Sequence, residues 1–178
     1  MVSLRALEPE DCDVLHSWID SADALFQWSG AWDFRWPLER GRLRRDLAAA
    51  GERRRLYAAV VDGELAGHVM LTVQPEHRLG VIGRVLVDPA RRGGGVGTAL
   101  MREIVRLGFD DVGLHRLQLA VYDFNQTAIA CYQRVGFVIE GRLRDATLGS
   151  KGYWNAYVMA LLEPEYRNAR GAAPDGRA

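Results

Sequence analysis

The sequence predicts a single α/β domain of the α+β kind, with a mixed, mostly antiparallel sheet of about seven strands flanked by about four helices. Strand-like and helix-like runs alternate along residues 1–162, as is typical of layered sheet-and-helix domains. Short glycine-containing turns join strand-like runs within 54–73 and within 137–162, which indicates antiparallel hairpins. Between these hairpins a helix-like run connects strands at 81–88 and 116–122, so we expect those two strands to run parallel.

The first third of the chain predicts one strand and two helices. The alternating run 2–7 predicts a strand, and Pro9 with neighbouring acidic residues favours the start of a helix. Residues 22–37 are rich in aromatic side chains, and we expect them to be irregular. A second helix is expected from Pro37 to Ala50.

The middle of the chain predicts a hairpin, a central strand and a helix. Asp62 and Gly63 both tolerate positive φ, which favours a tight turn inside 54–73. Residues 80–88 are nearly all apolar, which is typical of a strand buried on both faces. A helix of about 13 residues is expected after the glycines at 93–97.

The last third predicts a strand, a helix and a long hairpin. Residues 114–123 read as a strand, and 125–136 as a helix that Gly136 ends. Two long strands, 137–148 and 151–162, follow around a glycine turn.

Length and composition place the chain among ordinary globular proteins. Its 178 residues suit one domain, which we expect at 1–162, with 163–178 a frayed or disordered tail. The 23 basic and 23 acidic residues balance, so the bulk charge favours neither nucleic acid nor a membrane as a partner. No apolar run is long enough to span a bilayer and no secretory leader is evident, so we expect a cytoplasmic protein. Cys12 and Cys131 lack metal-type spacing and are expected to be free thiols, with no metal bound.

A glycine-rich stretch at 91–98 has the composition of an anion site at a helix start. Four glycines remove the Cβ atoms that would hold a ligand away from the free N–H groups of the first helical turn, and two arginines add positive charge. A lysine followed by Ser or Thr is missing, which excludes a Walker loop, and the glycine spacing fails the dinucleotide pattern. A turn that merely caps a helix is the alternative.

Two motifs together resemble the GNAT N-acetyltransferase superfamily. The first is Arg-x-x-Gly-x-Gly at 92–97, placed between an apolar strand and an apolar-faced helix. The second is Asn-x2-Ala-x3-Tyr-x3-Gly-Phe at 125–137, which begins 28 residues after Gly97. The resemblance covers 1–162, and the ending "GYWNAYVMALL" is similar to the branch of ribosomal-protein and polyamine N-acetyltransferases.

This resemblance implies a sheet splayed open between the two parallel strands, with acetyl-CoA as cosubstrate in the gap. Tyr132 matches the family's general acid, which donates a proton to the departing thiolate; a core tyrosine on an amphipathic helix is the alternative. The positions that the resemblance assigns to the cofactor are Leu86, Val87, Arg91, Arg92, Gly93, Gly94, Gly95, Val96, Gly97, Thr98 and Asn125. Asn125 is also an N-cap by residue type.

The resemblance implies a primary amine as acceptor, either a small molecule such as a polyamine or the N-terminus of a protein or peptide. Some family members carry a glutamate on the strand before the glycine loop, but 80–87 contains no carboxylate, so the base is unassigned. Glu76, His77, Asp33, Asp145 and a water chain are candidates, although each side chain is also typical of a solvated surface. His68 and His115 are expected to be structural.

An aromatic segment is expected beside the acceptor. Trp28 and Trp32 belong to a group of four tryptophans between 18 and 36, which either walls the acceptor site or packs the first helices onto the sheet. Tyr153, next to Trp154 in the last hairpin, is a candidate for the other side of the site. An exposed aromatic patch also indicates a possible homodimer.

A non-catalytic acyl-CoA-binding sensor or subunit is the alternative function, because the strand carboxylate is missing.

Overall fold

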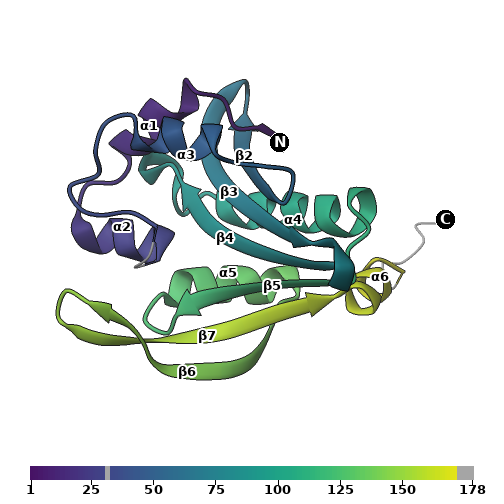
Figure 1. Cartoon of the computed structure of the whole chain (residues 1–178). Coiled ribbons are helices and arrows are strands. Elements are labelled where there is room, and N and C mark those ends of the chain that lie inside the picture. Colours follow the sequence, from purple (N-terminus) through teal and green to yellow (C-terminus); the bar gives the residue numbers. More distant parts are fainter. Residues whose placement is uncertain (31–32, 172–178) are drawn as a thin grey trace.

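The computed structural model describes residues 1–30 and 33–171. One seven-stranded sheet runs through the molecule in the order β1-β2-β3-β4-β5-β7-β6 (Figure 1). The strands are β1 (Val2–Ala6), β2 (Arg54–Val61), β3 (Glu64–Gln74), β4 (Leu79–Val87), β5 (Arg116–Tyr122), β6 (Val138–Gly149) and β7 (Gly152–Leu162). The α-helices are α1 (Asp11–Ser17), α2 (Ala22–Ser29), α3 (Arg42–Ala48), α4 (Val96–Arg106), α5 (Gln126–Val135) and α6 (Glu163–Gly171). The mixed, mostly antiparallel sheet confirms the predicted fold class, with more helices than expected.

The sheet splits at its parallel pair. β4 and β5 pair in parallel over only three residues each, with Leu79–Val81 of β4 opposite Arg116–Gln118 of β5. Beyond this short ladder the two strands diverge (Figure 1). Every other neighbouring pair of strands is antiparallel. The predicted parallel strands are therefore confirmed, and the sheet opens toward the C-terminal ends of both.

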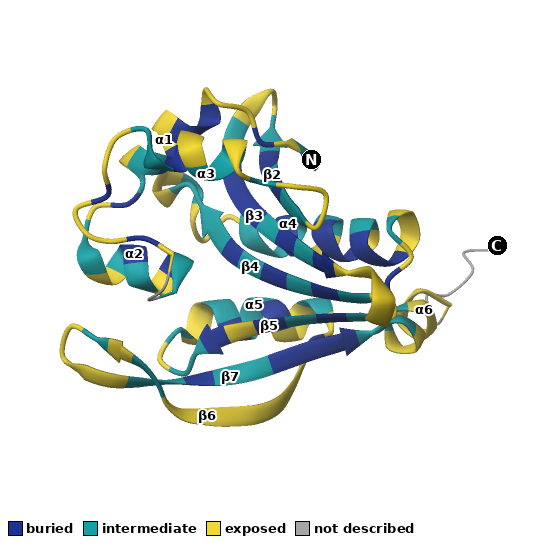
Figure 2. Cartoon of the chain, in the orientation of Figure 1, coloured by how far each residue is buried: buried dark blue, intermediate teal, exposed yellow. Residues whose placement is uncertain are grey.

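Apolar side chains form two cores, one on each face of the sheet. Helices α4 and α5 bury Leu100, Met101, Ile104 and Ile129 against one face. Helices α1, α2 and α3 bury a second cluster against the other face, over β2. Figure 2 shows the result: the middle strands are largely buried, whereas the edge strand β6 is exposed. Each face of the sheet is thus covered by its own apolar cluster and set of helices.

The segment predicted to be irregular contains a helix. The Ser21 side chain accepts a hydrogen bond from the Ala24 N–H at 3.2 Å and so caps α2, which buries Leu25 and Trp28. The prediction of irregular structure was wrong. The buried face of α2 consists of only Leu25 and Trp28, three residues apart, so it gives too short a helical pattern to stand out within a run of aromatic residues. The helix predicted at 37–50 is shorter in the structure than expected, because α3 begins only after Gly41, which has φ of +77°.

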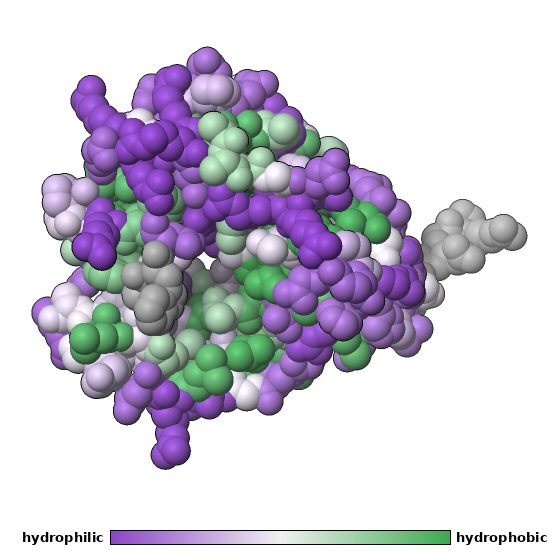
Figure 3. Space-filling model, viewed as in Figure 1, coloured by the Kyte–Doolittle hydropathy of each residue, from purple (hydrophilic) through white to green (hydrophobic). Residues whose placement is uncertain are grey.

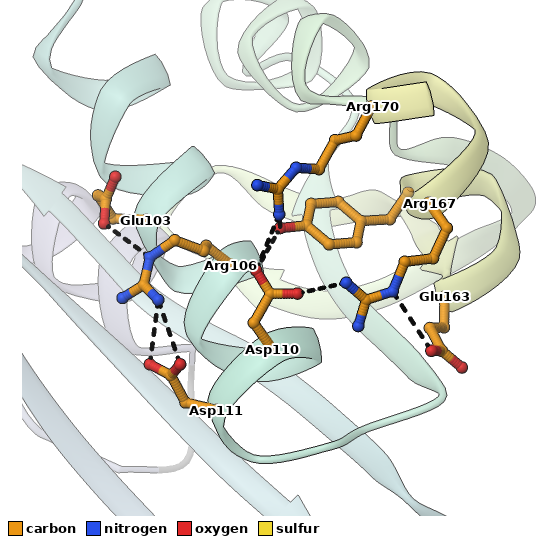
Figure 4. Close-up of polar contacts among 8 residues, drawn as sticks. Glu103, Arg106, Asp110, Asp111, Glu163, Arg167 and Arg170 are labelled. Atoms are coloured by element: carbon orange, nitrogen blue, oxygen red, sulfur yellow. Dashed lines mark hydrogen bonds and ion pairs between the residues drawn. The ribbon is translucent and has the colours of Figure 1, made fainter. Parts of the chain in front are cut away.

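The segment after Leu162, expected to be frayed, begins with helix α6. The Tyr166 ring lies 4.9 Å from that of Phe109, measured between ring centroids. Asp110 accepts hydrogen bonds from Arg167 at 2.6 Å and Arg170 at 2.9 Å, as Figure 4 shows. Because these contacts come from residues more than 50 positions away, the local composition gave no sign of them. Residues 172–178 lie outside the described part of the chain.

Within residues 1–30 and 33–171, no helix has both the length and the apolar character needed to cross a membrane.

Candidate active site

A cleft of about 760 Å³ occupies the split between β4 and β5. Its walls come from most of β4, the C-terminal half of β5, the first turn of α4, helices α2 and α5 and the β6–β7 ribbon. Figure 3 shows apolar side chains gathered beside the hollow that opens on this face. The cleft thus brings together segments as far apart in the chain as Trp18 and Ala156.

A bulge in β4 aims this strand into the cleft. Arg84 has φ of +52°, and the register with β3 shifts between the pairs Met70–Gly83 and His68–Leu86, which leaves one extra residue in β4. The Trp28 indole N–H donates to the Arg84 carbonyl at 2.8 Å and holds the bulge. After the bulge, β4 has lost its pairing with β5, so its backbone edge faces the cleft.

The glycine stretch forms a tight turn that leads into α4. Gly93 and Gly95 have φ of +80° and +83°, and Gly95 is the N-cap residue of α4, where no side chain can accept a hydrogen bond from the first-turn N–H groups. A Cβ atom at either position would meet nothing within 4 Å, so the turn needs glycine for its conformation rather than for space. These N–H groups are therefore free to meet an anion.

Of the residues assigned to the cofactor, five line the cleft, and these are Leu86, Val87, Arg92, Gly97 and Asn125. The other six, which are Arg91, Gly93, Gly94, Gly95, Val96 and Thr98, lie in the adjoining turn and the start of α4. The Arg91 side chain is engaged by Glu64 and Asp88. The Asn125 side chain accepts from the Ala128 N–H at 3.2 Å, which confirms the predicted N-cap of α5.

Tyr132 lies on α5 with its ring buried and lines the cleft. Burial raises the pKa of its hydroxyl well above the ordinary value, and the neighbouring Cys131 thiol acts in the same direction. No residue of the described chain forms a hydrogen bond with this hydroxyl. Tyr132 is therefore a neutral O–H donor whose bonding capacity is unused.

The part of the cleft beside α2 carries an ionic network centred on Arg84. The Arg84 guanidinium donates to Asp46 at 2.6 Å and to Asp33 at 2.8 Å, and Arg54 donates to Asp46 at 2.9 Å. Burial opposes ionisation of Asp46, but the hydrogen bonds from the two arginines hold the pKa of its carboxyl below the ordinary value. The Arg84 side chain is 4% exposed, whereas that of Asp33 is 44% exposed and lines the cleft.

Aromatic rings cover this network. Trp28 and Phe34 stack with centroids 5.7 Å apart, and the Arg84 guanidinium lies 4.7 Å from the Phe34 centroid. Trp18 and Trp28 both line the cleft, so the aromatic segment packs the helices and walls the cleft at the same time. Trp32 lies outside the described residues.

Other sequence candidates lie away from the cleft. Glu76 and His77 form a turn before β4, at the opposite end of this strand, and Glu76 pairs with Arg53 at 3.0 Å. Tyr153 is 63% exposed at the hairpin and does not line the cleft, and Asp145 lines a second recess between β6 and β7. Glu76 and His77 thus lie at the end of β4 away from the main cleft, and Asp145 and Tyr153 lie on the β6–β7 ribbon outside it.

His68 is a core residue, as expected. Its Nδ1 lies 2.9 Å from the Tyr57 carbonyl oxygen, and its ring meets Trp28 edge-on. Burial lowers the pKa of His68 to about 4, so the ring is neutral near pH 7. His68 therefore supports Trp28 rather than facing the cleft.

The sequence interpretation missed Arg84 and Asp46. A signal for Arg84 was present, because it is the only charged residue in the apolar run 80–87. A charged residue inside a central strand needs a buried partner, but nothing in the sequence identified Asp46 and Asp33 as the partners.

Comparisons with known proteins agree with this geometry. The family model described as "Acetyltransferase (GNAT) family" matches residues 17–137. The L-amino acid N-acetyltransferase AaaT of Escherichia coli K12 is 34% identical over 107 residues, which cover 59% of this chain and 66% of that protein. The spermidine N(1)-acetyltransferase of Escherichia coli K12 is 29% identical over 169 residues, which cover 93% of this chain and 88% of that protein.

A solved structure has the same fold. The spermidine N-acetyltransferase of Vibrio cholerae, crystallised in complex with CoA and spermine, superposes with a TM-score of 0.82 at 24% identity. The match covers 94% of this chain and 98% of that one. At this identity the likeness concerns the fold.

Proposed function

Because the chain belongs to the acetyltransferase (GNAT) family, we propose that it transfers an acetyl group from acetyl-CoA to a primary amine, with Tyr132 as the general acid. The observation that carries the proposal is the position of both sequence motifs on one cleft. Arg92 and Gly97 of the first motif and Asn125 and Tyr132 of the second line the same opening between β4 and β5. A glycine turn suited to an anion and a tyrosine hydroxyl without a hydrogen-bond partner thus line one opening, which supports the proposal.

The residues present fit coenzyme A. The N–H groups at Gly95 and in the first turn of α4 suit a diphosphate, since they lack side-chain caps and lie at the positive end of a helix. Arg92, whose Nε donates to the Val87 carbonyl at 3.3 Å, places a guanidinium on the cleft wall. The unpaired edge of β4 after the bulge offers backbone donors and acceptors to an extended amide-containing arm.

Tyr132 has the protonation state that the acid role needs. A thiol has an ordinary pKa of about 8.5, below the value of about 10 for tyrosine, so a neutral tyrosine can protonate a thiolate that leaves. Burial raises the pKa of Tyr132 further, which keeps its proton in place at neutral pH. The proton stays on the hydroxyl until negative charge develops on the sulfur.

On the acceptor side, Asp33 is the only one of the four sequence candidates for the base that lines the main cleft. We assign it contact with the incoming amine. The two relatives described above are named for L-amino acids and for spermidine, and both substrate types present a primary amine.

The test is replacement of Tyr132 by Phe. We expect kcat for acetyl transfer to a mixed panel of primary amines to fall about 10²- to 10⁴-fold, the range that general acids contribute. CoA affinity, measured by calorimetry, is expected to change less than twofold. Tyr157→Phe, on β7 outside the cleft, is the matched control and is expected to retain turnover.

The rival function makes a different prediction for the same assays. An acyl-CoA-binding sensor would bind CoA but turn over no amine in the unaltered protein. Equal turnover by the Tyr132→Phe variant and the parent would contradict the acid role while leaving acetyl transfer intact.

A further inference from the structure

We propose that the acceptor is an amine with one positive charge and an otherwise uncharged, apolar body, and that Asp33 binds its ammonium group. The inference rests on the proposed acetyl transfer and names the substrate class for that site. It comes from the charges, hydrogen bonds and apolar side chains that line the cleft.

Few charged side chains line the cleft. Among the described lining residues there are three, Asp33, Arg84 and Arg92. Residues 31 and 32, beyond the described part, are alanine and tryptophan and carry no charge. The cleft therefore presents one carboxylate, which matches one ammonium group.

That carboxylate is placed to receive a ligand. Asp33 accepts from Arg84 through Oδ2, and no described side chain hydrogen-bonds to its Oδ1. Because Arg84 is buried behind it and Asp33 is partly exposed, Asp33 is the end of the ionic chain that faces solvent. Its position is fixed from behind, so an incoming ammonium group meets an oriented acceptor atom.

Neither of the two cationic side chains, Arg84 and Arg92, is available to pair with a negatively charged group on the acceptor. The terminal nitrogens of Arg84 already donate to Asp46 and Asp33, and the side chain is 4% exposed, so it has no accessible donor for an acceptor carboxylate. Arg92 belongs to the glycine turn, where its charge favours the diphosphate. A second ammonium group on the acceptor would find no second carboxylate among the described lining residues.

The remaining walls at this end suit an apolar body. On one side the cleft is lined by apolar side chains of Trp18 and Ile19 after α1, Trp28 of α2 and Met70 of β3. On the other side it is lined by Leu143 and Ala156 of the β6–β7 ribbon. Burying an apolar body against these side chains is favourable, whereas burying an unpaired charge there is costly. The chain's similarity to spermidine acetyltransferases therefore does not extend to the charge of its acceptor.

The experiment compares amines that differ by one charge. Steady-state acetylation is measured with acetyl-CoA and two pairs, n-butylamine against 1,4-diaminobutane and 2-phenylethylamine against phenylalanine. The short diamine keeps its second ammonium group inside the cleft. We expect kcat/KM to be at least tenfold higher for the singly charged member of each pair.

Variants of Asp33 test the ammonium contact. Asp33→Asn is expected to raise KM for n-butylamine at least tenfold with CoA affinity unchanged, and Asp33→Glu is expected to restore part of the loss. Asp23→Asn removes the same charge from an exposed position on α2 outside the cleft, and is expected to leave KM unchanged. Melting temperatures of all three variants separate a loss of folding from a loss of binding.

Equal or higher kcat/KM for the diamine or for phenylalanine would overturn the inference, as would an Asp33→Asn variant with the KM of the parent. Both results leave the proposed acetyl transfer standing. If the protein binds CoA but acetylates no amine in either pair or in the wider panel, the proposed function itself is wrong, and the inference falls with it.

Discussion

The stability of the fold should depend on pH through His68. This residue is buried at the centre of the sheet, with Nδ1 2.9 Å from the Tyr57 carbonyl oxygen and its ring against Trp28. Burial lowers its pKa from 6.5 to about 4, so the folded protein holds a neutral ring at pH values where the unfolded chain already binds a proton. Stability is thus fully present above pH 6.5 and decreases as pH falls toward 4.

The shift in pKa sets the size of the effect. The shift from 6.5 to about 4 corresponds to about 3 kcal/mol between the fully neutral and fully protonated limits, at about 1.4 kcal/mol per pKa unit. Between pH 8 and pH 5 the same linkage removes about 2 kcal/mol. The lowered pKa values of Asp11, Asp46, Glu76 and Glu140 act in the same direction but mainly below about pH 5, so His68 contributes most of the change in this range.

Urea denaturation at pH 8 and pH 5 measures the loss directly. His77→Gln and His115→Gln, which remove exposed histidines, are matched controls and are expected to leave the difference intact. Calorimetric unfolding at pH 5 in buffers of different ionisation enthalpy should show net uptake of about one proton, as the linkage requires. A free energy of unfolding that is equal at the two pH values would refute the reasoning.

Two further predictions concern the glycine turn and the last helix. Gly95→Ala places a Cβ on a residue with φ of +83°, so we expect a loss of about 1 kcal/mol in stability and weaker CoA binding. Gly51→Ala, also in open space, is the control, and unchanged CoA affinity in Gly95→Ala would contradict the role of the turn. Tyr166→Ala removes the ring packed on Phe109 and the hydroxyl that donates to Asp110, so we expect thermal unfolding to show a loss of about 1–2 kcal/mol. A melting temperature equal to that of the parent would mean that α6 is dispensable.

The candidate site was predictable wherever its residues act through local backbone conformation. Asn125 caps α5 and Gly136 ends it at φ of +113°, both as residue type indicates. The same holds for the turn at Asp62 and Gly63, where both residues have positive φ. Such features involve only a few neighbouring residues, so they can be read from a short stretch of sequence.

Helix α2 and helix α6 were missed for different reasons. The face that α2 buries spans only two residues, Leu25 and Trp28, within a segment where nearly every large side chain is aromatic. Helix α6 has no buried residue of its own, and its contacts reach back to Phe109 and Asp110. Periodicity cannot reveal an element whose stability comes from contacts with a distant segment.

The sequence by itself determined the succession of strands along the chain, the parallel pair and the two motifs, because hydrophobic period and glycine conformation are properties of neighbouring residues. Only the tertiary structure brought Asp33 and Asp46 to Arg84, from 51 and 38 positions away. It also decided how deeply Tyr132 and His68 are buried, and with that the direction of their pKa shifts. Ion pairing and desolvation depend on distance in space, which the spacing of residues along the chain does not specify.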